Sequence, residues 1–167
     1  MPKVSNEIKE KIARIELLIL DVDGVLTDGK IYLGPSGEEF KTFFVPDGSA
    51  LIRGRKSGLI IAWISGRESA AVAMRAEELG IDEVFQGIKD KVKIFHELCR
   101  RYDSSPEATA CLGDDLVEAP LFKEVGFSAA VADAHPALKA DADYITARNG
   151  GEGAVTEVID LIISNRP

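Results

Sequence analysis

Short apolar segments with the character of β-strands alternate along this sequence with segments of helical periodicity. We predict strands over Leu17–Val22, Leu59–Ser65, Glu83–Gln86, Thr109–Leu112, Phe127–Val131 and Tyr144–Thr146. We predict helices over Ser69–Leu79, Lys89–Tyr102, Leu116–Val125 and Ala154–Ile163. Strands that are apolar throughout are buried on both faces, and strands that alternate with helices form parallel sheets. The pattern therefore predicts an α/β fold of the Rossmann-like, doubly wound kind, with helices on both faces of a parallel sheet.

One segment breaks this alternation and has the pattern of a β-hairpin. Lys30–Leu33 and Glu38–Val45 have strand character, and they flank the four turn residues Gly-Pro-Ser-Gly. The hairpin directly follows the loop after the first strand. It is therefore either a flap over a ligand site or an oligomer contact, and the sequence leaves both interpretations open.

The composition narrows the classes of partner. The 167 residues suffice for one domain over residues 1–167, and 46% of them are hydrophobic. The net charge is −8 and there is no basic tail, which argues against nucleic acid or an anionic membrane as the main partner. An anionic substrate would need cations close to its binding site.

The cysteines and the N-terminus favour a cytoplasmic protein. Cys99 and Cys111 form no CxxC pair, which favours reduced, buried thiols over a disulfide or a zinc site. The N-terminal segment lacks the pattern of a signal peptide, and the apolar run Leu17–Leu20 is too short to span a bilayer.

Polar residues follow four of the predicted strands at the point where each strand ends. In open α/β sheets, ligands bind beyond the carboxyl ends of the strands. The residues found there are Asp21, Asp23 and Gly24, then Ser65, Gly66 and Arg67, then Lys89, Lys91 and Lys93, and finally Gly113, Asp114 and Asp115. A hydroxyl, lysines and several carboxylates at one edge would suit a divalent cation together with a phosphate group.

The first acid pair has three possible interpretations. An EF-hand calcium loop is excluded, because Val25 and Tyr32 occupy positions that need ligands and a strand precedes the motif. Asp21 and Asp23 either serve the conformation of a turn, or form a nucleophilic carboxylate beside one that carries a proton. The motif alone does not decide between these two.

The other polar residues carry unequal information. Ser65 and Arg67, taken alone, are typical of a turn residue and a surface charge. Lysines at a helix start suggest a nearby anion. The selection of Lys91 for this role, with Lys89 and Lys93 treated as solvated, follows from the motif spacing of the resemblance described below.

Of the two adjacent acids, Asp114 is the better metal ligand. Asp115 and Glu118 have the spacing of a capping box, which leaves Asp114 to join Asp21 as a hard oxygen ligand for Mg²⁺. His96 and His135 are interpreted as structural or surface residues.

The order of these motifs resembles a known family. DxDGxLTDG, then SGR, then QGxxxK, then GDD is similar to the haloacid dehalogenase superfamily, in particular to its small capless group of 3-deoxy-D-manno-octulosonate 8-phosphate phosphatases. The similarity runs from Leu17 to Glu157 and includes GEEFKTFFVPDG, GDDLVEAP, VADAHP and GGEGAVTE.

The resemblance implies a role for each motif residue. Asp21 would be the nucleophile and a Mg²⁺ ligand, and Asp23 the general acid/base, which also ligates the metal through its backbone carbonyl. Ser65 and Lys91 would hold the transferring phosphoryl group, and Asp114 would complete the metal site.

The resemblance also implies substrate contacts and an assembly. Substrate contacts would fall at Asp47, Gly48, Gly66, Arg67 and the Gly150–Gly153 loop. The fold would have no large cap, and the protein would be a homotetramer with the hairpin at a subunit contact. This chain departs from the family at three positions, where it carries Pro46, Glu118 and Thr156.

The resulting hypothesis is a Mg²⁺-dependent phosphatase that acts on a phosphorylated 2-keto-3-deoxy sugar acid through an aspartyl-phosphate. The expected substrate is 3-deoxy-D-manno-octulosonate 8-phosphate, and the alternative is a nine-carbon, sialic-acid-type 9-phosphate. Two further hypotheses are a receiver domain, which also combines acids, a hydroxyl and a lysine on a parallel sheet, and a non-catalytic oligomerisation module.

Overall fold

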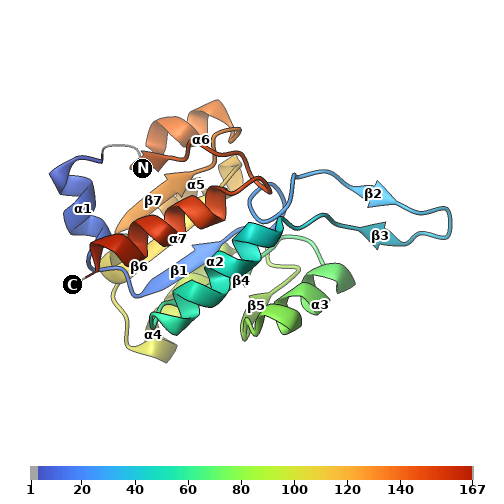
Figure 1. Ribbon diagram of the computed structural model, residues 1–167, viewed down its shortest axis with the longest axis horizontal. Coiled ribbons are helices and arrows are strands. Elements are labelled where there is room, and N and C mark those ends of the chain that lie inside the picture. The colour runs from blue at the N-terminus through green and yellow to red at the C-terminus, as the bar shows by residue number, and fades with distance from the viewer. Residues whose placement is uncertain (1–3, 167) are drawn as a thin grey trace.

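Six parallel strands form the central sheet of the computed structural model, which describes residues 4–166 (Figure 1). The strand order is β5–β4–β1–β6–β7–β8. The strands are β1 (Leu17–Leu20), β4 (Ile60–Ile64), β5 (Glu83–Phe85), β6 (Thr109–Gly113), β7 (Phe127–Ala130) and β8 (Tyr144–Ile145). The predicted doubly wound α/β fold is confirmed, and most strands end one or two residues before the predicted boundary. The described residues contain the hairpin and no large cap.

Helices cover both faces of this sheet. They are α1 (Asn6–Ile12), α2 (Val45–Lys56), α3 (Ala70–Leu79), α4 (Lys91–Tyr102), α5 (Ala119–Phe122), α6 (Pro136–Asp141) and α7 (Ala154–Asn165). In Figure 1, α2 and α7 lie side by side across one face, with α1 against α7 and α3 against α2. Helix α4 packs with α5 on the opposite face. None of the helices in the described part of the chain has the length and apolar character needed to cross a membrane.

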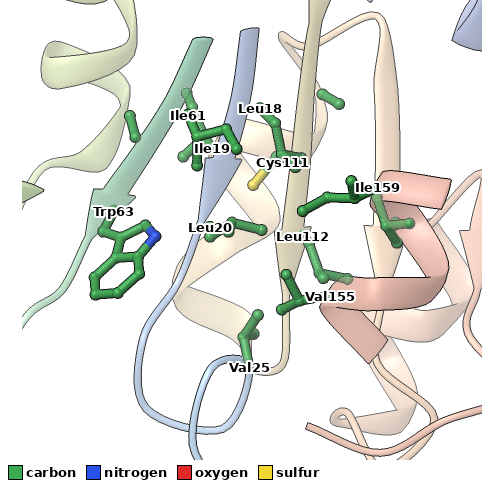
Figure 2. Packing of buried hydrophobic residues seen from close by; sticks show 14 of the residues in the cluster. Leu18, Ile19, Leu20, Val25, Ile61, Trp63, Cys111, Leu112, Val155 and Ile159 are labelled. Carbon is green, nitrogen blue, oxygen red and sulfur yellow. The ribbon is translucent and has the colours of Figure 1, made fainter. Parts of the chain in front are cut away.

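The core lies between the sheet and these helices. Leu112 of β6 belongs to the same buried cluster as Val155 and Ile159 of α7 (Figure 2). Cys99 and Cys111 are both buried and free, as expected.

Several boundaries differ from the sequence-based prediction. Helices α1, α2 and α6 were not predicted, and the segment after Leu116 forms a 3₁₀ turn (Leu116–Glu118) before the short helix α5. In the hairpin only β2 (Tyr32–Leu33) and β3 (Glu39–Phe40) pair. The predicted second strand was wrong in extending to Val45, because α2 begins there. The neighbouring Phe and Val residues resemble a strand, which explains the prediction. Helix α2 starts at this point because the fixed φ of Pro46 suits the first turn of a helix.

Strand β1 lies at the point where the winding of the sheet reverses. It pairs with β4 on one side and with β6 on the other, both in parallel. The connections from adjacent strands at such a point leave in opposite directions, which opens a crevice at the carboxyl ends. The residues that follow β1 and β6 therefore face this crevice.

Candidate active site

A cavity of about 390 Å³ opens at the carboxyl end of the sheet. It is lined by Asp21, Asp23, Ser65, Gly66, Arg67, Ile88, Lys89, Lys91, Asp114, Asp115 and Val117. The structure thus brings together all of the predicted catalytic and metal-binding residues. Of the predicted substrate contacts, Gly66 and Arg67 line the cavity, whereas Asp47 and Gly48 do not.

The loop after β1 is shaped by close backbone packing. The Asp21 N–H continues the sheet by donating to the Leu112 carbonyl at 3.1 Å, and the chain then turns. Gly24 has φ +98°, and a Cβ there would lie 2.1 Å from Asp114 Oδ2. A side chain on Gly150 would in turn lie 1.6 Å from the Gly24 carbonyl oxygen. Glycine at these positions therefore lets Asp114 and the Gly150 loop approach the acid pair from two sides.

Lys91 lines the cavity and joins three elements. Asp90 caps α4 by accepting a hydrogen bond from the Lys93 N–H, which makes Lys91 the first helical residue. The buried Lys91 ammonium contacts Asp21 Oδ1 and lies 2.5 Å from Glu118 Oε1. A buried ammonium requires such partners because it has lost its hydration.

Glu118 has a role that the sequence analysis missed. The predicted capping box with Asp115 is present, and Glu118 Oε2 accepts from the Asp115 N–H at 3.2 Å. The same side chain, 1% exposed, also binds Lys91. The lysines at the start of α4 indicated a nearby anion, but the spacing of Glu118 indicated only the capping box.

Burial and the crowded carboxylates shift three pKa values. Burial raises the pKa of Asp21 to about 6, although the Lys91 ammonium opposes this rise. Burial, together with the nearby charges of Asp21 and Glu118, raises the pKa of Asp114 to about 8. Burial by itself would lower the pKa of Lys91, but Asp21 and Glu118 raise it above its ordinary value, so Lys91 stays charged. The site therefore holds more negative than positive charge when its acids are ionised.

Ser65 and Arg67 follow β4. The Ser65 hydroxyl oxygen accepts from the Arg67 N–H at 3.1 Å, which is the local turn that the sequence indicated. Its own proton is still available for donation into the cavity. Arg67 Nη2 donates to Glu39 Oε2 at 2.7 Å, so the guanidinium is tied to the hairpin.

Lys41 of the hairpin is a second cation that the sequence analysis missed. Its side chain is 1% exposed, its ammonium contacts Asp23 Oδ1, and Glu39 Oε1 lies 3.3 Å away. Residues 39 and 41 are two apart on an extended chain, so their side chains share a face. That spacing, in a hairpin next to the acid pair, was a usable signal.

Asp47 and Gly48 lie in the first turn of α2, away from the cavity. Asp47 is buried, and its Oδ1 accepts from the Thr156 N–H at 2.8 Å and the Thr156 hydroxyl at 2.6 Å. This joins the starts of α2 and α7, and it explains what Thr156 does in this chain. A Cβ at Gly48 would lie 2.5 Å from Arg75 Nη2. A substrate contact at Asp47 or Gly48 stays a prediction that the position of these residues does not support.

The two histidines lie outside the residues that line the cavity, in structural or surface settings, as expected. His96 Nε2 lies 2.9 Å from Glu124 Oε2 at the surface. His135 caps α6 by accepting a hydrogen bond from the Ala137 N–H at 3.2 Å.

Comparison with known proteins identifies the family. The family model of haloacid dehalogenase-like hydrolases matches residues 60–159. The 3-deoxy-D-manno-octulosonate 8-phosphate phosphatase KdsC of Yersinia pestis is 46% identical over 160 residues, which cover 96% of this chain and 86% of the relative. The enzyme of the same name from Escherichia coli K12 is also 46% identical, over 96% of this chain and 85% of its own.

Solved structures agree over almost the whole chain. The crystal structure of the Yersinia pestis phosphatase has a TM-score of 0.96 at 45% identity, covering 98% of this chain and 88% of that one. A second, from Moraxella catarrhalis, contains a magnesium ion, a phosphate ion and a KDO molecule, with a TM-score of 0.95 at 40% identity over 98% and 94% of the two chains. The chain therefore belongs to the haloacid dehalogenase-like hydrolases, in the phosphomonoesterase group of the 3-deoxy-D-manno-octulosonate 8-phosphate phosphatases.

Proposed function

We propose that this protein is a Mg²⁺-dependent phosphatase that hydrolyses 3-deoxy-D-manno-octulosonate 8-phosphate through an aspartyl-phosphate on Asp21. The observation that carries the proposal is the Lys91 ammonium, held against Asp21 in a cavity that also contains Asp23, Ser65 and Asp114. The assignment of this substrate is supported by the relatives, which are named 3-deoxy-D-manno-octulosonate 8-phosphate phosphatases. Membership of a hydrolase family argues against the receiver domain and the non-catalytic module.

The donor set fits Mg²⁺. The charge of Asp21 is close enough to Asp114 to contribute to the raised pKa of Asp114, and a cation bound between the two carboxylates would relieve this repulsion. No three His, Cys, Asp or Glu side chains among residues 4–166 form a metal site by themselves. Mg²⁺ commonly takes one or two carboxylates and completes its shell with waters and phosphate oxygens. We assign Asp21, Asp114 and the Asp23 backbone carbonyl as its protein ligands.

In the first step, an Asp21 carboxylate oxygen attacks phosphorus. The new oxygen–phosphorus bond forms as the bond to the sugar oxygen breaks, and the Asp23 carboxyl gives its proton to that departing oxygen. Lys91 and the Ser65 hydroxyl face the phosphoryl oxygens, where charge accumulates. Bound Mg²⁺ would supply further positive charge at these oxygens.

In the second step, water replaces Asp21 on phosphorus. The Asp23 carboxylate takes a proton from the water as its oxygen bonds to phosphorus, and the bond to Asp21 breaks. Inorganic phosphate leaves, Asp21 is again a carboxylate, and Asp23 is again protonated.

The hairpin supports the proposal of a homotetramer. Several of its large apolar side chains are exposed, including Ile31, Leu33 and Phe40. Exposed apolar side chains that cluster on one protruding element are typical of a protein contact. We propose that a second copy of the chain covers this surface. A cytoplasmic location stays a prediction.

Replacing Asp21 with Asn should lower kcat by at least about 10³-fold, because the amide is not a nucleophile. Phosphate release with Mg²⁺ measures the loss. Asp28→Asn is the matched control, since this acid of the same loop binds Tyr32 instead of lining the cavity. Near-normal turnover by Asp21→Asn would show that the nucleophile is assigned wrongly.

Raising the pH from about 6 to about 8 should destabilise the metal-free protein. Between its ordinary pKa and its folded-state pKa of about 8, Asp114 keeps a proton in the folded protein that the unfolded chain has lost, so stability falls as the pH rises. Mg²⁺ should reverse this loss and therefore raise the melting temperature more at the higher pH.

Thermal unfolding with EDTA or with saturating Mg²⁺ tests this expectation. The Asp114→Asn variant should show a flatter decline with pH and little response to Mg²⁺. An equal response to Mg²⁺ in this variant and the wild type would contradict the assignment of Asp114 as a ligand.

The substrate should be distinguished by a panel of phosphorylated 2-keto-3-deoxy sugar acids assayed with Mg²⁺. We expect kcat/KM for the eight-carbon 8-phosphate to exceed that for a nine-carbon 9-phosphate by at least about tenfold. The reverse order would favour the nine-carbon alternative while leaving the chemistry intact.

A Leu33→Glu and Phe40→Glu double variant should shift the protein from tetramers to smaller species, because it places charge in the apolar surface of the hairpin. Sedimentation velocity measures the change. Met74→Glu is the control, since Met74 is a strongly exposed apolar residue outside the hairpin. Unchanged tetramers in the double variant, or a wild type that is a monomer, would exclude this contact.

A further inference from the structure

The hairpin reaches into the active site through a line of alternating charges. The line runs from Asp23 in the β1 loop to Lys41 and Glu39 on the hairpin, and then to Arg67 after β4. Lys41 contacts Asp23 Oδ1, Glu39 Oε1 lies 3.3 Å from the Lys41 ammonium, and Glu39 Oε2 accepts from Arg67 Nη2 at 2.7 Å. Three segments that are separate in the sequence are joined in this way.

The burial of Lys41 makes this more than a surface ion pair. Its side chain is 1% exposed, while the side chains of Asp23 and Glu39 are 23% and 19% exposed. An ammonium removed from water is tolerated only when charged partners replace its hydration. Asp23 Oδ1 accepts a hydrogen bond from Lys41, and Glu39 Oε1 forms a second ion pair with the same ammonium at 3.3 Å.

The contact uses only one oxygen of Asp23. Lys41 occupies Oδ1, which leaves Oδ2 for the exchange of a proton. A carboxylate held by one oxygen cannot rotate freely about its side-chain bonds, and its other oxygen keeps a fixed direction. Asp23 and Lys91 line the same cavity, so this direction matters for the reacting group.

We propose that Lys41 is a positioning residue for Asp23, through which the hairpin holds the general acid/base in place for proton transfer. The proposal rests on the proposed function, because it takes Asp23 as the proton carrier. It gives the hairpin a chemical role in the site of its own chain, in addition to any contact with a second copy.

The first test compares two leaving groups in the Lys41→Met variant. The sugar oxygen needs a proton as it leaves, whereas p-nitrophenolate does not. We expect the formation of the phosphoenzyme from the sugar phosphate to slow by about 10²-fold. With p-nitrophenyl phosphate, the variant should release a burst of p-nitrophenolate at the wild-type rate and then turn over slowly, because the second step still needs Asp23.

The second test is a double-mutant cycle on the sugar phosphate. If Lys41 acts through Asp23, Lys41→Met should add less than about threefold to the loss caused by Asp23→Asn. Lys41→Arg should recover part of the activity, since it restores a cation. Lys30→Met is the matched control on the same hairpin, because Lys30 is largely exposed.

The outcomes separate this proposal from the proposed function. Losses that multiply in the double variant, or a slowed burst with p-nitrophenyl phosphate, would overturn the role of Lys41 even if the wild type is an active phosphatase. If the proposed function is wrong, the wild type will release no phosphate with Mg²⁺, or Asp21→Asn will keep near-normal turnover. Circular dichroism and sedimentation check the fold and assembly of each variant, and Lys41→Gln replaces Lys41→Met if the latter does not fold.

Discussion

The buried Lys91 ammonium between Asp21 and Glu118 is the interaction on which the site depends. It links the loop after β1, the first turn of α4 and the 3₁₀ turn after β6. Without this cation, the buried carboxylates of Asp21 and Glu118 would repel one another with no positive charge between them. Its position at a helix start is unfavourable for a cation by the helix dipole alone, so the paired acids outweigh that effect.

The parallel sheet makes such a concentration of charge possible. Each strand is held by its neighbours along its length, so the residues that follow β1, β4 and β6 have little freedom to separate. Gly24 and Gly150 remove the side chains that would keep Asp114 and the last loop at a distance. The remaining excess of negative charge makes the crevice suitable for a divalent cation. The lysine and arginine side chains around the crevice make it suitable for a phosphate group.

The hairpin can take part both in a contact with a second copy of the chain and in the active site of its own chain. The hairpin exposes apolar side chains such as Phe40, and it also carries Lys41 and Glu39 into the charge network. The alternation of side chains along an extended chain places Phe40 on the face opposite Glu39, whereas Leu33 pairs with Glu39 and shares its face. A flap over the site and an oligomer contact both stay predictions for the hairpin, and one element can serve both purposes.

The sequence by itself determined the parallel sheet, the carboxyl edge as the place of the site, and the acids, hydroxyl and lysine that gather there, because hydrophobic periodicity and the polar residues that follow each strand are local features of the chain. It also indicated the capping box of Asp115 and Glu118. Only the tertiary structure decided which charges meet: that Glu118 binds Lys91, that Lys41 binds Asp23, and that Asp47 turns inward to Thr156. Such pairings join residues far apart in the chain, and their geometry follows from how the layers pack, which no local pattern encodes.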